Sequence, residues 1–405
     1  MIIVDNGIDY HDNKAVKQVA EFKRLLDMEI PKNLVKGSGA AFLWGPRGTG
    51  KTTHLKQKYP KARYYDLLQS DLFTELTLQP NRLREEVLAQ RPATVVIDEI
   101  QKIPRLLDEI HWLLENTPTC IILCGSSARK LKREAKNLLG GRAVSFKLFP
   151  LVTAEIKDFN LNQALQFGMN PRHYLEDKPR PLLKAYVNNY LKEEIIDEAI
   201  VRNIPSFAKF LEIVALTHGQ LLNYTNVGRE AGVSPSTVRD YYQILEDTLI
   251  GHALEPWRKQ KDRRLIETAK FYLFDVGIAN YLHPEVRQVA EGTDIYGNAF
   301  EHFLLEEVRA YMSYRDRDEP LTFWRTASGY EVDLIIGSME TCLEFKSSKN
   351  IGANHLKGLR ALKEEHKVRR AIVVSREESL RKTMDGIEMM PWRHFCRELW
   401  AGRIF

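Results

Sequence analysis

The chain has 405 residues, of which 44% are hydrophobic and 28% are charged, and this composition is ordinary for folded globular proteins. It excludes collagen-like, largely disordered and membrane-embedded classes, and the length predicts two or three domains of about 150 residues. The net charge of +5 is too small to indicate nucleic-acid binding by the chain as a whole, so any basic surface has to be local.

The N-terminal residues MIIVDNGIDYHDN lack the basic segment and the long apolar core of a signal peptide. No apolar stretch in the sequence approaches the roughly 20 residues that a transmembrane helix needs. The four cysteines are too few for a disulfide framework and form no Cys/His cluster with zinc spacing. We therefore predict a cytoplasmic protein without a membrane partner, in which Cys120 and Cys124 are buried thiols.

Residues 38–150 alternate short apolar runs with amphipathic stretches, and this alternation predicts an α/β domain over residues 1–154 with a parallel sheet flanked by helices. The predicted strands are AAFLW (40–44), RYYDL (63–67), TVVID (94–98), CIILC (120–124) and AVSFKLF (143–149).

The segment GPRGTGKTT follows the first predicted strand and matches the phosphate-loop pattern G-x-x-x-x-G-K-[S/T]. Its glycines permit backbone conformations that direct N–H groups at phosphate oxygens, and the helix that follows presents its positive N-terminal end. Lys51 is expected to bridge the β- and γ-phosphates of ATP, and the Thr52 hydroxyl to hold Mg²⁺. The expected nucleotide-binding residues are Gly45, Pro46, Arg47, Gly48, Thr49, Gly50, Lys51, Thr52, Thr53 and Asp98.

An acidic pair ends the predicted strand TVVID, at the position expected for a Walker B motif. Asp98 would lie beside the Mg²⁺ site, and together with Thr52 it is a predicted metal ligand. Glu99 could polarise an attacking water as general base, which favours hydrolysis over nucleotide binding alone.

The next strand, CIILCGSS, ends in Ser126 and Ser127, and either hydroxyl could contact the γ-phosphate or the attacking water. The alternative is that a serine caps the following helix, and one serine could serve each role. Arg129, Arg133 and Arg142 are candidate γ-phosphate or trans-acting arginines, with Arg142 the preferred one, although each could be an ordinary surface arginine.

The segments WGPRGTGKTT, VVIDEIQKIP, LCGSSARKL and GGRAVSFKLFPL resemble prokaryotic P-loop ATPases of the AAA+/STAND-related group. The resemblance implies a sheet with an extra strand between the Walker A and Walker B strands. It continues through NYLKEEI, THGQLLNYTNVGREAGVSPSTVRDYYQILEDT, KFYLFDVGIANYL and YGNAFEHF, and so covers nearly the whole chain. In such ATPases the C-terminal region is poorly characterised.

Residues 155–205 have helical spacing and are predicted to form a lid or connector, and residues 206–284 are predicted to form a winged helix. In the latter, Ser234 would cap the third helix with Pro235 in its first turn, and RKQKDRR (258–264) would lie between two wing strands. A DNA-reading version would present Ser236, Thr237 and Arg239 to the major groove. The alternative is a domain connector, because residues 206–275 carry as many acidic as basic residues.

The segments GYEVDLIIG and TCLEFKSS place Asp333 on one strand and Glu344 and Lys346, as E-x-K, on the next. Residues two apart on a strand point to the same face, so two carboxylates and a lysine would meet there. Asp333 and Glu344 could hold Mg²⁺ while Lys346 activates water or stabilises a phosphate, and Glu301 on an upstream helix could add a carboxylate.

This arrangement resembles the PD-(D/E)xK fold of restriction endonucleases, which implies a catalytic set of Glu301, Asp333, Glu344 and Lys346 within a domain over residues 285–405. Val332 stands where the literal motif has proline, and an inactive relative of these nucleases is the alternative.

Together these patterns predict a Mg²⁺-dependent, ATP-hydrolysing AAA+-like protein that couples nucleotide state to a DNA-binding, nuclease-like C-terminal half. The alternatives are an ATP-driven protein-binding switch and a signalling scaffold with an inactive nuclease-like domain. The expected cofactors are ATP and Mg²⁺, and the expected partners are DNA or another nucleic acid, a second copy of the chain or another protein.

Overall fold

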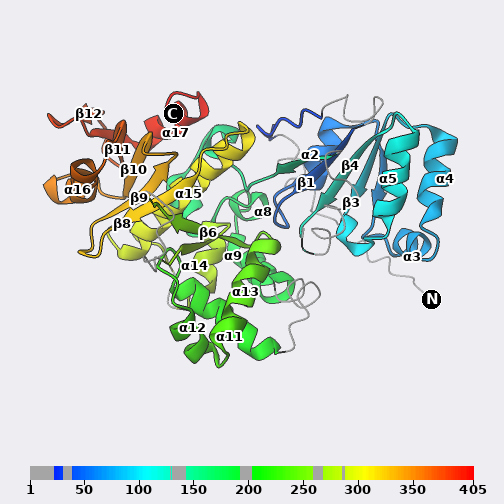
Figure 1. The fold of residues 1–405 in the computed structure, drawn as a ribbon, viewed down its shortest axis with the longest axis horizontal. Helices are drawn as coiled ribbons and strands as arrows, with labels where there is room; N and C mark the ends of the chain where they lie inside the picture. Colours follow the sequence, from blue (N-terminus) through cyan, green and yellow to red (C-terminus); the bar gives the residue numbers. More distant parts are fainter. Residues whose placement is uncertain are drawn as a thin grey trace, which may run out of the picture.

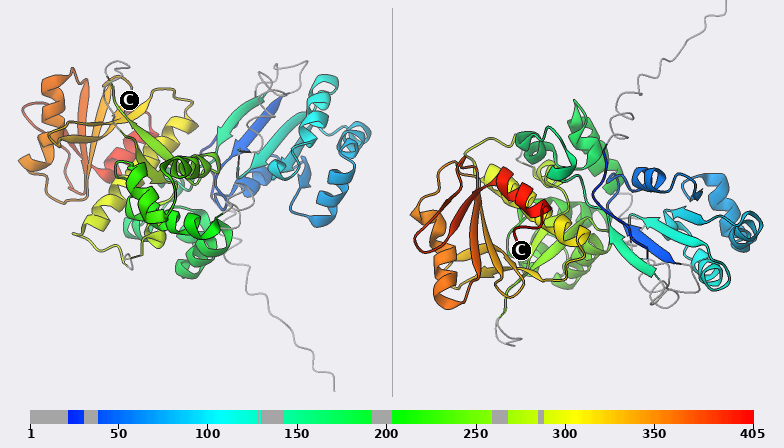
Figure 2. Two further views of the ribbon diagram at one scale, coloured as in Figure 1. Left: turned by 60° about the horizontal axis from the view of Figure 1, so that its bottom comes forward. Right: turned by 90° about the horizontal axis from the view of Figure 1, so that it is seen from above.

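The computed structural model describes residues 22–30, 39–127, 129, 143–191, 203–258, 268–284 and 288–405. Figure 1 shows two lobes, one built on a five-stranded sheet and the other on helices and an eight-stranded sheet. The chain crosses between the lobes after residue 147, and the described N-terminal segment, residues 22–30, runs between them (Figure 2).

The first sheet is parallel and has the strand order β2-β3-β4-β1-β5. All five apolar runs singled out in the sequence form strands, and β4 separates the phosphate-loop strand β1 from the acidic strand β3, as the family resemblance implies. Strand β1 is buried along its entire length, since helices cover both faces of the sheet. The elements are β1 (Ala40–Trp44), α2 (Lys51–Lys58), β2 (Arg63–Asp66), α3 (Ser70–Leu78), α4 (Asn81–Gln90), β3 (Thr94–Asp98), η1 (Ile100–Lys102), α5 (Leu106–Asn116), β4 (Cys120–Gly125) and β5 (Ala143–Lys147).

The predicted connector consists of short helical segments, two of which begin at a proline that fixes the backbone for a first helical turn. Residues 192–202 of the predicted connector lie outside the described part of the chain. The elements are η2 (Thr153–Glu155), α7 (Leu161–Phe167), α8 (Pro171–Tyr174), α9 (Pro179–Ala185) and the π-helical segment η3 (Tyr186–Leu191).

Three helices and an antiparallel strand pair follow, in the order predicted for a winged helix. The Ser234 side chain accepts a hydrogen bond from the Thr237 N–H, with Pro235 in the first turn, and Gly232 takes a positive φ of 70° where the preceding helix ends. Of the predicted wing RKQKDRR, Arg258 alone belongs to the described residues. The elements are α11 (Ile204–Leu216), α12 (Tyr224–Ala231), α13 (Pro235–Asp247), β6 (Gly251–Pro256) and β7 (Lys270–Leu273).

The second sheet has the order β12-β13-β11-β10-β9-β8-β6-β7 and therefore includes the strands of the predicted wing. Strand β6 pairs in parallel with β8 through Glu255 and Pro256, so the predicted boundary after residue 284 divides one continuous sheet. The sequence pattern identifies β6 and β7 as strands but carries no information on a partner more than 60 residues away. The remaining elements are α14 (Val276–Leu282), α15 (Asp294–Tyr314), β8 (Leu321–Arg325), β9 (Glu331–Ile336), β10 (Thr341–Lys346), η4 (Ala353–Leu356), α16 (Lys357–Glu365), β11 (Arg370–Ser375), β12 (Arg381–Lys382), β13 (Glu388–Pro391) and α17 (Trp392–Trp400).

Helix α15 connects the two lobes. It packs against β10 and α17 of the C-terminal lobe, against α7 of the connector and against β5 at the edge of the first sheet. Its buried face includes Phe300, Phe303 and Leu304, which belong to the largest hydrophobic core.

All four cysteines are free. Cys124 is buried as predicted, and so are Cys342 and Cys396, but Cys120 is only half-buried because it stands at the beginning of β4. None of the described helices combines the length and the apolar character that crossing a membrane requires.

Candidate functional site

The loop after β1 is folded as an anion receptor. Gly48 and Gly50 have φ angles of 85° and 89°, in the left-handed region that glycine adopts readily. Lys51 Nζ donates to the carbonyl oxygens of Gly45 (2.7 Å) and Pro46 (3.2 Å), which holds the ammonium group at the loop. Because α2 begins at Lys51, its first N–H groups and its positive end are directed at the same place.

The acidic pair at the end of β3 lies next to this loop. Thr52 Oγ1 donates to Asp98 Oδ2 over 2.6 Å, so the two predicted Mg²⁺ ligands are already adjacent. The Tyr64 hydroxyl, from the neighbouring strand β2, also donates to Asp98 Oδ2 (3.0 Å). A hydroxyl and a buried carboxylate offer the oxygen ligands that Mg²⁺ prefers, and the site therefore fits the ion.

Glu99 is held by Gln101, which the sequence patterns did not identify, and lies beside the predicted site residue Ser126. It adopts a positive φ of 58°, and its carboxylate accepts a hydrogen bond from Gln101 Nε2. The same amide nitrogen donates to Ser126 Oγ (3.1 Å), which also lies 3.4 Å from the Glu99 carboxylate. A Cβ at Gly125 would lie 2.4 Å from Gln101 Oε1, so glycine is needed there to accommodate the glutamine.

The two serines at the end of β4 occupy different positions. Ser126 faces Glu99, whereas Ser127 Oγ accepts a hydrogen bond from the Arg129 N–H (3.2 Å). The candidate arginines Arg133 and Arg142 lie outside the described residues.

A cleft lies beside the loop, between α2, the connector and the N-terminal segment. The predicted nucleotide-binding residue Thr53 lines it, and so does His54, whose pKa is lowered by burial to about 4, which makes its imidazole neutral at pH 7. Its lining residues are Phe22, Arg24, Thr49, Gly50, Thr53, His54, Gln57, Leu151, Pro171 and Leu175. Arg24, 25 positions before Thr49 of the loop, could not be found from sequence spacing.

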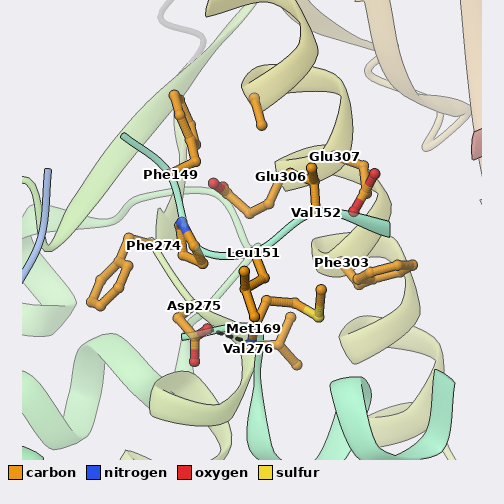
Figure 3. Close-up of a pocket in the computed structure, with 12 residues that line it drawn as sticks. Phe149, Leu151, Val152, Met169, Phe274, Asp275, Val276, Phe303, Glu306 and Glu307 are labelled. Atoms are coloured by element: carbon orange, nitrogen blue, oxygen red, sulfur yellow. Dashed lines mark hydrogen bonds between the residues drawn. The ribbon is translucent and has the colours of Figure 1, made fainter. Parts of the chain in front are cut away.

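A second pocket lies where the connector meets α15, and buried carboxylates line it (Figure 3). Asp275 Oδ2 accepts hydrogen bonds from the N–H groups of Met169 (2.7 Å) and Asn170 (2.9 Å), and the Asn170 side chain donates to the Arg47 carbonyl of the phosphate loop (3.2 Å). Glu307 accepts from the Thr153 N–H and hydroxyl, at 2.7 and 2.8 Å, and from the Trp400 indole N–H, at 2.8 Å. Burial raises the pKa of Asp275 to about 6 and that of Glu307 to about 7.

The four predicted nuclease-like residues converge at one place in the C-terminal lobe. Lys346 Nζ lies 2.6 Å from Glu344 Oε1 and 3.8 Å from Asp333 Oδ2, and Asp333 Oδ2 also accepts from the Phe345 N–H (2.7 Å). Burial, and next Asp333, raise the pKa of Glu344 to about 8. Glu344 Oε2 is buried without a hydrogen-bond partner.

Strand β7 adds residues to this cluster that the sequence analysis missed. Lys270 Nζ forms an ion pair with Glu331 and lies 3.7 Å from Glu301, and the Tyr272 hydroxyl donates to Glu301 (2.7 Å). Two lysines therefore already pair with the carboxylates. Within the described part of the chain, no three His, Cys, Asp or Glu side chains are arranged to hold a metal ion.

Three family models match successive parts of the chain. Residues 38–157 match an AAA domain, residues 158–289 a domain of unknown function (DUF8612), and residues 296–395 a domain of unknown function (DUF4143). Together with the loop and the strand order, the first match defines residues 38–157 as an ATP-binding P-loop domain of the AAA+ type.

The curated relatives are uncharacterized proteins. One from Mycobacterium tuberculosis is 25% identical over 304 residues, which is 73% of this chain and 66% of that protein. One from Methanocaldococcus jannaschii is 25% identical over 418 residues, covering 87% of this chain and 83% of that protein. The chain thus matches just under two thirds of the length of the mycobacterial relative.

Two solved structures illustrate distant matches. The ORC1 protein of Aeropyrum pernix in complex with DNA is 15% identical, covers 67% of this chain and 92% of that chain, and has a TM-score of 0.29. A signal transduction ATPase with numerous domains from Pyrococcus horikoshii is also 15% identical, covers 73% of this chain and 49% of that chain, and has a TM-score of 0.21. Scores this low do not establish a shared fold.

Proposed function

We propose that the chain is a Mg²⁺-dependent ATPase whose nucleotide state is coupled to a C-terminal half that contacts nucleic acid and carries a nuclease-like site. One observation carries the ATPase proposal. Lys51, the Thr52–Asp98 pair and the Gln101-held Glu99 meet at the ends of the parallel strands β1 and β3, around a glycine loop with left-handed φ angles.

In the proposed reaction, the loop N–H groups and Lys51 bind the phosphates, with Lys51 exchanging its carbonyl partners for phosphate oxygens. Thr52 and Asp98 would hold Mg²⁺, which neutralises phosphate charge when bound. Glu99 accepts the proton of the attacking water, while Gln101 and Ser126 orient its carboxylate. The nucleoside would lie in the cleft beside Thr53 and His54.

The test is phosphate release from ATP by the full chain, with and without Mg²⁺. The chain is expected to hydrolyse ATP only with the metal, and Asp98→Asn should reduce the rate to background. Equal rates with and without Mg²⁺ would contradict the proposal.

The C-terminal cluster supports the nuclease-like part of the proposal, since side chains from four elements meet there and one carboxylate oxygen of Glu344 is buried without a partner. Asp333 and Glu344 would supply oxygen ligands to a divalent ion that polarises phosphate when bound, and Lys346 would neutralise the developing charge. The test is Mn²⁺-dependent cleavage of DNA by the full chain.

A second candidate is an ATP-driven switch whose C-terminal lobe binds protein and has no nuclease activity. The ion pairs that Lys270 and Lys346 already form favour it, because their ammonium groups compensate charge that a metal ion would otherwise compensate. Absence of cleavage with Mg²⁺ or Mn²⁺, combined with ATP hydrolysis, would select this candidate.

DNA contact is proposed for the unit formed by α11, α12 and α13. The Arg239 guanidinium lies 5.1 Å from the Tyr224 ring centroid, and Ser234 Oγ lies 2.8 Å from both Ser236 Oγ and Thr237 Oγ1. Ser234, Ser236, Thr237 and Arg239 lie at the start of α13, the helix that a winged helix would place in the major groove, and Tyr224 contacts Arg239 from α12.

A further inference from the structure

Arg24 joins segments of the chain that are far apart in the sequence. Its side chain is 5% exposed and belongs to the segment 22–30 that runs between the lobes (Figure 2). Its guanidinium donates to five groups: the carbonyls of Thr49 (2.6 Å), Phe149 (2.7 Å) and Pro150 (3.1 Å), the Glu155 carboxylate (3.0 Å) and the Tyr314 hydroxyl (3.2 Å).

A buried guanidinium requires partners in fixed positions, because an unpaired buried charge is strongly destabilising. The planar fork of arginine directs its N–H groups at set angles, so displacement of one partner perturbs the bonds to the others. Glu155 extends this junction, since its carboxylate also accepts from the Leu25 N–H (2.7 Å) and the Val152 N–H (3.2 Å). Arg24 and Glu155 therefore form a rigid connection rather than a surface ion pair.

One end of the connection is the nucleotide site. Thr49 belongs to the phosphate loop, and Arg24 lines the same cleft as Gly50 and Thr53. A Cβ on Gly50 would lie 3.8 Å from Arg24 Nη1, so the guanidinium lies beside the loop peptide. A polyanionic ligand in the cleft would act on Arg24 directly by charge and indirectly through the Thr49 carbonyl.

The other end of the connection is α15. Tyr314 is the last residue of this helix, and its hydroxyl accepts hydrogen bonds from Arg24 and from the Phe149 N–H (3.1 Å). Its ring contacts those of Phe149 and Trp400, each with a centroid distance of 6.0 Å. The same helix carries Glu307, bonded to Thr153, and Glu301 of the C-terminal cluster, so a shift at its end moves a continuous helix.

We propose that Arg24 is the positioning residue through which occupation of the nucleotide site is communicated to α15 and thus to the C-terminal lobe. The inference rests on the proposed ATP site and specifies how that site is linked to the rest of the chain. A second contact between the loop and the connector, from the Asn170 side chain to the Arg47 carbonyl, is the competing route.

The test is hydrogen exchange of the full chain, with and without saturating Mg²⁺ and the non-hydrolysable analogue AMPPNP. In the wild type we expect AMPPNP to change exchange by about fivefold in peptides covering residues 303–314. Tyr314→Phe keeps the ring but removes the hydroxyl, and should bind AMPPNP within about threefold of the wild type while losing most of this response. Arg24→Gln should lose the response and also bind more weakly.

Three control variants distinguish the route through Arg24 from general effects of substitution and from the competing route. Lys23→Gln changes an exposed cation of the same segment, and Tyr311→Phe removes a hydroxyl of α15 that faces Gly402; both should respond like the wild type. Asn170→Ala should also retain the response.

Failure of the wild type to bind AMPPNP would overturn both this inference and the proposed function. Binding without any change in α15 would overturn this inference alone. A full exchange response of α15 in both Arg24→Gln and Tyr314→Phe at saturating AMPPNP would also overturn this inference alone. Loss of the response in Asn170→Ala, with a full response in the other variants, would assign the coupling to the competing route.

Discussion

The nucleotide site and the C-terminal cluster use similar residues in opposite ways. At the first site Lys51 donates to backbone carbonyls, while Asp98 accepts from two neutral hydroxyl groups, so the lysine charge stays available for an anion. At the second site Lys346 and Lys270 are paired with carboxylates, and Glu344 has a pKa raised to about 8 by burial and by Asp333.

The difference indicates that the phosphate loop is better prepared for an anion than the C-terminal cluster is for a divalent cation. The phosphate loop offers uncompensated positive charge and N–H groups, so under the proposed function only the nucleotide and its metal ion have to be added. Before the C-terminal cluster can hold a divalent cation, its carboxylates have to lose their contacts with the lysines. Glu344 also has to release its proton when it is protonated.

The largest expected effect separates binding from turnover at the first site. Glu99→Gln should leave ATP affinity within about twofold and slow hydrolysis by roughly 100-fold or more, because it preserves shape and removes the base. Phosphate release and equilibrium binding measure the two quantities, with Glu115→Gln on α5 as a surface control. Equal loss of binding and turnover would show that Glu99 has another role.

At the second site, Asp333→Ala should abolish Mn²⁺-dependent DNA cleavage and weaken Mn²⁺ binding without nucleotide by roughly 10-fold or more. The exposed Asp318→Ala serves as control.

If lysine pairing limits metal binding, Lys270→Met should raise the affinity for Mn²⁺ by about 10-fold, since one competing cation is removed. Mn²⁺ binding that is identical in all three variants would show that the cluster takes no metal.

The buried carboxylates between the lobes predict a pH dependence of stability. Burial raises the folded-state pKa of Glu307 to about 7, from an ordinary value of 4.5, so the folded state binds its proton more tightly than the unfolded state. The resulting stabilisation is complete below about pH 4.5 and is lost as the pH rises through 7.

The wild type should therefore lose unfolding free energy between pH 5 and pH 7.5, and Glu307→Gln should lose about 2 kcal/mol less over the same range. Urea denaturation at the two pH values measures this, and the exposed Glu378→Gln should behave like the wild type. The same pH dependence in Glu307→Gln and in the wild type would refute the role of this carboxylate.

The smallest expected effect concerns nucleic acid. Neutralising the basic run Arg258, Lys259, Lys261, Arg263 and Arg264 should lower DNA affinity, and each lost phosphate contact should reduce the log–log salt slope by about 0.9. Binding titrations over a range of salt concentrations measure the slope. An unchanged slope would exclude this run from the DNA contact.

The sequence predicted what local patterns encode. The five apolar runs of the first sheet, the glycine loop and the E-x-K strand pair all appear where they were expected, because each depends on residues close together in the chain. Glu301 was expected to add a carboxylate from an upstream helix, and the family resemblance implied the same role, but no local pattern gave its position relative to the two strands.

The missed residues act across long sequence separations. Arg24 contacts Tyr314, and Lys270 and Tyr272 reach the acidic cluster from a strand assigned to another domain. Gln101 was visible in the DEIQK segment, but its contact with Ser126 depends on the pairing of β3 with β4, in which a glycine leaves room for the amide.

The central claim is that the loop around Lys51 binds ATP, and equilibrium binding of ATP with Mg²⁺ to the full chain tests it most directly. We expect Lys51→Ala to lose affinity by on the order of 100-fold, because no other side chain replaces its contact with the phosphates. Lys61→Ala, an exposed lysine just after α2, should bind like the wild type. Equal affinities of the wild type and Lys51→Ala would contradict the account.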